Sequence, residues 1–235
     1  MKNYLSVLFA AIALPATLAA ASFEGKVSFK MTSGREKPQD ITYNIKGDKI
    51  RIELPGQKQM GGMIMDTAKK ETTVIMDEQQ MYMVMPVPDA TAATDSKKGA
   101  EAKLEKTNET EKILGYTATK YISTYEGTTT EMWLAEGLGT FMSFSNSNPM
   151  AGGGRRGSGG VPQGWDRALA GKDLFPLRVV GKDRANKETF RLEATAVNKQ
   201  TLPDSMFVPP PGYQKFDMGG MMKGMFPGGI PGGRQ

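Results

Sequence analysis

The strongest constraint on this fold is a pair of alternating segments joined by a two-residue turn. Apolar and polar residues alternate over residues 41–45, Gly47-Asp48 follows, and the alternation resumes over residues 50–54. A period of two is typical of a half-buried strand, and glycine in the first position of a two-residue loop favours a type II′ hairpin. Such a hairpin pairs Ile45 with Ile50, Tyr43 with Ile52 and Ile41 with Leu54, so all six side chains share one face.

Methionine dominates the next three alternating segments. Residues 63–66, 71–77 and 80–85 have the pattern of strands joined by a four-residue loop and a two-residue turn. This register predicts three cross-strand pairs: Met63–Val74, Val74–Met83 and Met76–Met81. One side of the strands then carries Met63, Met65, Val74, Met76, Met81, Met83 and Met85, and the other carries Ile64, Ile75, Tyr82 and Val84. Because both sides are apolar, we expect one to meet a core and the other a cover or a ligand.

Further strands are predicted over residues 26–31, 117–125, 128–134, 177–180 and 188–197. Two stretches depart from alternation, and we expect flexible insertions at 86–111 and at 146–164. The first is either a solvated linker or contains a weak helix over 100–106. A short helix is expected over 165–174. The pattern as a whole predicts a mainly β protein with a single domain over 22–217, followed by a disordered, Met/Gly-rich tail over 218–235.

The first residues have the order of a secretory signal peptide. Lys2 supplies the positive start, residues 4–14 are almost unbroken apolar sequence, and small residues follow Pro15. We expect a signal peptide over 1–21 with cleavage between Ala21 and Ser22. The apolar run is shorter than the roughly 20 residues that span a bilayer, so no transmembrane segment is expected. The sequence thus predicts an exported protein, periplasmic or extracellular, that is soluble after cleavage.

Several short motifs occur together in a fixed order along the mature chain. They lie at residues 23–25, 43–51, 65–66, 81–83, 114–121, 131–133, 175–178 and 202–213. With these motifs the chain resembles the exported bacterial family catalogued as domain of unknown function 4412, and their order is similar to that of the LolA-like group of periplasmic lipoprotein and lipid carriers. The resemblance covers most of residues 23–216 and implies a curved antiparallel sheet, an open half-barrel, with a few short helices capping its concave side.

The composition removes most catalytic chemistry. The chain has no cysteine and no histidine, which excludes thiol nucleophiles, Ser-His catalysis and metal sites built on those two residues. There is no Gly-x-Ser-x-Gly elbow and no phosphate-binding loop with a flanking strand and helix. We therefore expect a protein that is not an enzyme and that needs no cofactor. The net charge of +5 is spread along the chain, so nucleic acid is not an expected partner.

Methionine is the unusual residue, with 17 in the chain. Its flexible thioether adapts to irregular gaps and to varied apolar partners, so the seven residues of the predicted face suit a ligand surface; ordinary core packing is the alternative. Thioether sulfur also binds Cu(I). The tail holds four such sulfurs within eight residues, at Met218, Met221, Met222 and Met225. The alternative is a disordered tail that is rich in methionine and glycine and is not a metal site.

Three functions follow as hypotheses. The first is a binding module that holds an acyl chain, a lipid or a lipidated partner in a methionine-lined concave face. The second is a periplasmic copper(I)-handling protein that uses the tail. The third is a non-catalytic structural protein of the envelope. Lipid adducts on the purified protein would favour the first and copper adducts the second.

Overall fold

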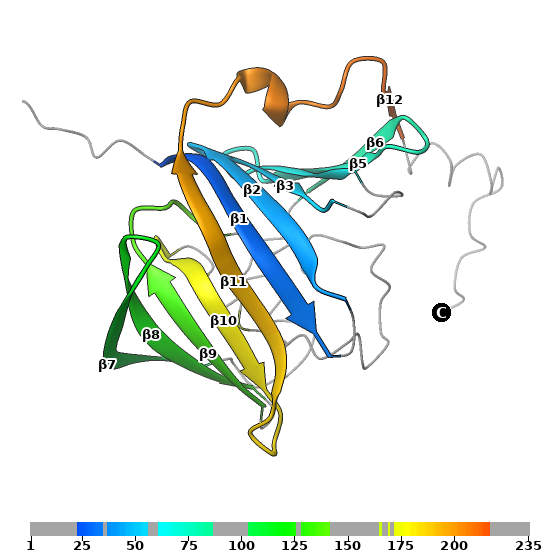
Figure 1. Ribbon diagram of the computed structural model, residues 1–235. Coiled ribbons are helices and arrows are strands. Elements are labelled where there is room, and N and C mark those ends of the chain that lie inside the picture. The colour runs from blue at the N-terminus through cyan, green and yellow to red at the C-terminus, as the bar shows by residue number, and fades with distance from the viewer. Residues whose placement is uncertain are drawn as a thin grey trace, which may run out of the picture.

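The computed structural model describes residues 23–34, 37–55, 61–86, 103–125, 128–141, 165, 169 and 172–216. These residues form one twelve-stranded sheet, shown in Figure 1. No helix among them is long and apolar enough to cross a membrane. The first six strands are β1 (Glu24–Ser33), β2 (Gln39–Lys46), β3 (Lys49–Glu53), β4 (Gly62–Asp66), β5 (Glu71–Met76) and β6 (Met81–Pro86). The others are β7 (Lys103–Ile113), β8 (Tyr116–Tyr125), β9 (Thr128–Ala135), β10 (Phe175–Lys182), β11 (Glu188–Lys199) and β12 (Gln214–Lys215).

The strand order is β12-β6-β5-β4-β3-β2-β1-β11-β10-β9-β8-β7. Strands β1 to β6 run outward from β1 as successive hairpins, and β11 closes the other side of β1 and leads to β10, β9, β8 and β7. All neighbouring pairs are antiparallel except β12 with β6, which is parallel. In Figure 1, β4–β6 lie across the top of the molecule, above the strands that run from β1 to β7. The mainly β architecture with an antiparallel sheet, expected from the sequence, is confirmed.

The hairpin of β2 and β3 has the predicted register. Ile45 pairs with Ile50 and Tyr43 with Ile52. Gly47 has φ of 55° whereas Asp48 has no positive φ, as a type II′ turn requires. The third predicted pair, Ile41 with Leu54, lies beyond the last paired residues, because the ladder ends at Thr42 and Glu53.

An aromatic core lies against the face that this hairpin shares with its neighbours. Tyr43 is fully buried, and its ring stacks on Phe141 at 5.4 Å between centroids and meets Phe29 edge-on at 5.4 Å. Phe175 joins the same group, at 6.0 Å from Phe29. Aromatic pairs at these separations add attraction to the gain from burial, which makes this cluster the centre of the main core.

Strand β7 corrects one expectation. Residues 103–111 of the predicted 86–111 insertion belong to an eleven-residue strand, and the weak helix over 100–106 is wrong in its described part. The strand lies at the end of the sheet order, where charged side chains are usual because they discourage pairing with other chains. Its carboxylates bind cations of other strands: Glu109 pairs with Lys120 at 3.3 Å and Glu111 with Arg178 at 2.8 Å.

Helices are scarce in the described part of the chain. The one helix with defined bounds there is the 3₁₀ helix η3 (Asp204–Phe207). This helix packs on the outer face of the sheet. The resemblance implied helices on the concave face, which is the opposite side. The signal peptide with its cut at Ala21 and Ser22, the 146–164 loop and the 218–235 tail all lie outside the described residues, as does most of the helix expected over 165–174.

Candidate functional site

The predicted methionine pairs are present in the register of β4, β5 and β6. Met63 pairs with Val74, Val74 with Met83, and Met76 with Met81. Strand β3 continues the same face, because Ile50 pairs with Met65. We call this surface the methionine face; it consists of Met63, Met65, Val74, Met76, Met81, Met83 and Met85.

Burial along the methionine face changes from strand to strand. Met65 and Met63 on β4 are 0% and 1% exposed, and Val74 and Met83 are 3% exposed. Met76, Met81 and Met85 are only partly buried. The face therefore runs continuously from the edge of the main core, which Met65 joins, to partly open side chains at β6.

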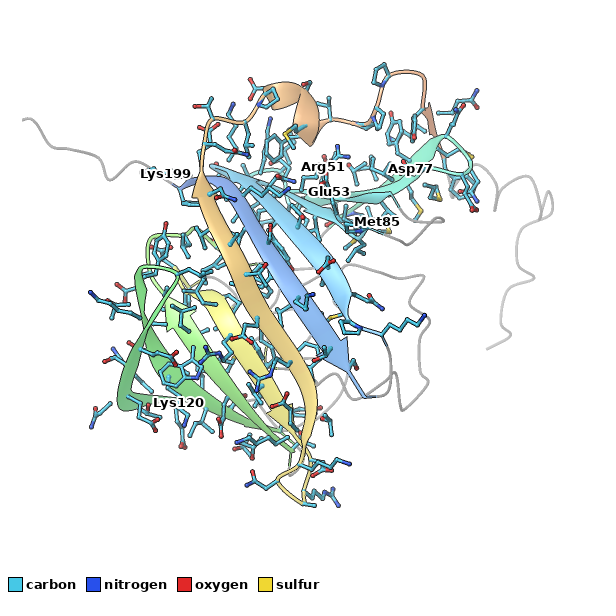
Figure 2. All side chains as sticks on the ribbon, viewed as in Figure 1. Arg51, Glu53, Asp77, Met85, Lys120 and Lys199 are labelled. Atoms are coloured by element: carbon cyan, nitrogen blue, oxygen red, sulfur yellow. The ribbon has the colours of Figure 1, made fainter. Side chains whose placement is uncertain are left out.

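The opposite face of the same strands is covered by the chain itself. We call residues 202–216 the C-terminal strap. Leu202 and Phe207 of the strap form a buried cluster with Ile64 and Ile75, and Tyr82 packs against it. Figure 2 shows the two sides: Met85 lies below the cyan strands, whereas Arg51 lies above them, beneath the strap.

Polar contacts hold the strap at both ends. The Lys46 ammonium donates to the carbonyl of Leu202 at 2.7 Å and pairs with Asp204 at 2.8 Å. Arg51 donates to the carbonyl of Met206 at 3.0 Å, and the Tyr213 hydroxyl donates to Asp77 at 2.9 Å.

These contacts shift ionisation. The hydrogen bond from Lys46 lowers the pKa of Asp204, and the same contact raises the pKa of Lys46. The hydrogen bond to Asp77 raises the pKa of Tyr213. The strap is therefore fixed by a packed cluster and by charge, and it covers Ile64 and Ile75, whereas Tyr82 and Val84 on the same face stay partly exposed.

Two cavities lie on the described surface, and the sequence did not indicate either. One, of about 340 Å³, is at the far end of the sheet and is lined by Thr117, Thr119, Tyr121, Leu134, Glu136 and Leu174. The other, of about 250 Å³, lies beside the β2–β3 and β4–β5 turns and is lined mainly by charged residues. Cross-strand pairing through Met132 and Tyr121 puts the first cavity on the same face as the core. A pattern that is periodic within one strand does not show where strands leave space between them.

The acidic side chains do not form a metal site in the part of the chain that the structure describes. In those ranges, no group of three or more aspartate or glutamate side chains is placed to hold a metal ion. The four tail methionines proposed for Cu(I), Met218, Met221, Met222 and Met225, lie outside those ranges.

The fold and this surface define the class of protein. The chain is an antiparallel sheet around an aromatic core, and it has an apolar methionine face at one end. The chain belongs to the family described as domain of unknown function DUF4412, whose model matches residues 23–213. No curated protein matches the chain.

Solved structures resemble the chain at low sequence identity. An uncharacterized conserved protein from Thermus thermophilus is 13% identical with a TM-score of 0.50, over 84% of this chain and 91% of that one. The LolA superfamily protein NE2245 from Nitrosomonas europaea is 14% identical with a TM-score of 0.33, over 81% and 91%. In the MucA/MucB complex structure from Pseudomonas aeruginosa, the matched chain is 11% identical with a TM-score of 0.39, over 80% and 56%.

Proposed function

We propose that this protein is an exported, non-catalytic carrier that holds an apolar ligand on its methionine face. The ligand class is an acyl chain, a lipid or a lipidated partner. The observation that carries the proposal is the methionine face itself: it is continuous over β4, β5 and β6, and its side chains become more exposed toward β6. A ligand that lies over β6 then has apolar contact with the partly exposed Met76, Met81 and Met85.

Methionine suits this role because it is unbranched and has three rotatable bonds, so one set of side chains fits partners of different shape. The same strands carry isoleucine and an aromatic residue on the face that meets the strap, where the partner is always the same. Methionine thus occurs on one side of these strands only. This favours the explanation that the side is a surface for a variable partner, over the explanation that these strands are rich in methionine in general.

The test is to place a charge at the open end of the face. Met81→Glu puts a carboxylate on a partly exposed side chain, where it stays hydrated, so we expect the melting temperature to remain within a few degrees. Uptake of N-phenyl-1-naphthylamine, a neutral apolar dye, is expected to fall at least tenfold. The matched control is Gln79→Glu, which adds the same charge at an exposed position two residues away and leaves uptake unchanged.

Two results would contradict the proposal. One is Met81→Glu protein that takes up the dye as well as the unmodified chain does. The other is unmodified protein that binds neither the dye nor any lipid extracted with it from cells, as read by native mass spectrometry. Copper adducts in that spectrum, without lipid, would favour the copper(I) hypothesis.

A further inference from the structure

One polar side chain lies within the methionine face. Thr72 of β5 pairs with Met65 on one side and with Met85 on the other, so its side chain is on the same face as theirs. It is 2% exposed, and its hydroxyl has no hydrogen-bond partner in the described part of the chain.

An unpaired buried hydroxyl is unfavourable, because it loses its hydration and gains no replacement. Other threonines of this sheet satisfy the hydroxyl by donating to a carbonyl: Thr107 to Lys120 at 2.9 Å and Thr128 to Tyr125 at 2.6 Å. Valine has nearly the same shape and strand preference as threonine and has no polar group to leave unpaired. Among the described residues, Ser33 and Asn44 also have an unpaired buried atom, but the methionine face contains neither.

We propose that the Thr72 hydroxyl donates a hydrogen bond to the ester carbonyl of an acyl ligand whose chain lies along the methionine face. This inference rests on the proposed carrier function and specifies its ligand class. A pure hydrocarbon would leave the hydroxyl unpaired. An ionised carboxylate would have to give up its hydration on a face whose members carry no charge, which costs far more than one hydrogen bond returns. A neutral acyl ester satisfies both conditions.

The neighbours of Thr72 provide the route by which the ligand reaches it. Met85 directly adjoins Thr72 and is partly exposed, on a strand that β12 pairs only at Met81 and Tyr82. The ligand therefore enters beside Met85, whose flexible side chain moves aside, and the carbonyl reaches the hydroxyl while the acyl chain lies over the partly exposed side chains of β6, Met81 and Met85.

The experiment compares Thr72→Val with Thr72→Ser, since valine removes the hydroxyl and serine keeps it. Displacement of the neutral dye is measured for methyl laurate, laurate and tetradecane, which are similar in length and differ in polar group. We expect Thr72→Val to bind methyl laurate roughly three- to tenfold more weakly, as the loss of one hydrogen bond predicts, and to bind tetradecane unchanged. Thr72→Ser is expected to retain the affinity for the ester.

The ligand-free protein gives a second, independent readout. Because the hydroxyl is unpaired without ligand, Thr72→Val is expected to raise the melting temperature while it lowers ester affinity. A hydroxyl with a purely structural role would give the reverse, a less stable valine variant. A free lipid and a lipidated protein both carry acyl esters, so monolauroylglycerol and a synthetic diacylated peptide are compared; the tighter ligand identifies the source, and valine must weaken both.

The outcomes separate this inference from the carrier function. If the unmodified protein binds the dye and the ester, and Thr72→Val binds methyl laurate equally well, the role of Thr72 is overturned and the carrier function stands. Preference for laurate over its methyl ester would likewise overturn the choice of a neutral ester. If the unmodified protein binds neither dye nor ester, the carrier function fails, and the role of Thr72 fails with it.

Discussion

The two faces of β4–β6 are both apolar but are built and covered differently. On the outer face, Ile64 and Ile75 are buried by Leu202 and Phe207 of the C-terminal strap. On the inner face the methionines join the main core at Met65 and become partly exposed at β6. Thus a segment of the same chain covers the outer face at β4 and β5, while both faces have partly exposed apolar side chains at their β6 end.

The proposed function gives a reason for this difference, namely that residue choice follows the constancy of the partner. A strap in the same chain presents the same shape in every molecule, so stiff isoleucine and aromatic side chains can pack against it with little loss of rotamer freedom. A face for exchangeable ligands benefits from side chains that repack. Methionine provides this, but its flexibility makes any single packing arrangement less well defined. The predictions below test whether the two faces differ in this way.

The largest expected effect is on the outer face. Phe207→Ala removes the strap's buried aromatic side chain, which is 5% exposed, and leaves a cavity over β4 and β5. We expect the free energy of unfolding to fall by about 3–5 kcal/mol, the usual range for a buried phenylalanine. Urea denaturation followed by tryptophan fluorescence measures it.

The neighbouring residue provides the control. Val208 is 48% exposed, so Val208→Ala is expected to change the free energy of unfolding by no more than about 0.5 kcal/mol. If both variants lowered the free energy of unfolding equally, the strap would not cover this face by packing of its buried side chain.

A smaller effect on stability is expected on the inner face. Met83→Leu conserves volume at a buried position, so the free energy of unfolding should change by less than about 1.5 kcal/mol. The range of acyl-chain lengths that displace the dye should narrow, because leucine is stiffer. Ile75→Met is the reciprocal exchange on the outer face, and it should leave the range of acyl-chain lengths that displace the dye unchanged. A change in that range would contradict the assignment of ligand binding to the inner face only.

Much of the architecture was predictable because the hairpins are local. The Gly47-Asp48 turn and the alternation around it determine the register of β2 and β3, and the same reasoning gave the pair of Met76 with Met81. In each case a short loop and a period of two agree, so the register has one solution that buries all the apolar residues.

What escaped prediction depends on contacts between distant segments. Strand β7 lacks apolar alternation. Its Glu111 is paired with Arg178 of β10, a residue that is distant in sequence. The strap is similarly non-local: Lys46 and Leu202 are 156 residues apart in sequence. Thr72 was not predictable because a threonine in a strand is ordinary, and only the structure shows that its hydroxyl is buried and unpaired.

The smallest expected effect concerns the charge that holds the strap over the outer face. The Lys46 hydrogen bond lowers the pKa of Asp204 below its ordinary value of 3.8, so this carboxylate stabilises the folded state above that value. The contribution disappears as the pH falls through the lower, folded-state pKa. The pKa of Lys46 is raised above 10.5, so its part is complete below that value and is lost as the pH rises through the raised, folded-state pKa.

Asp204→Asn tests this window. Asparagine cannot pair with the ammonium, so the variant should be slightly less stable than the unmodified protein between about pH 5 and 9, and the difference should vanish as the pH falls through the lowered, folded-state pKa of Asp204. Urea midpoints of both proteins are compared at each pH, which cancels the titration of all other carboxylates. Because Asp204 is largely exposed, 1 M salt should shrink the difference. A difference that persists unchanged at low pH would assign the effect to the packing of η3 and remove charge from the account of how the strap closes its face.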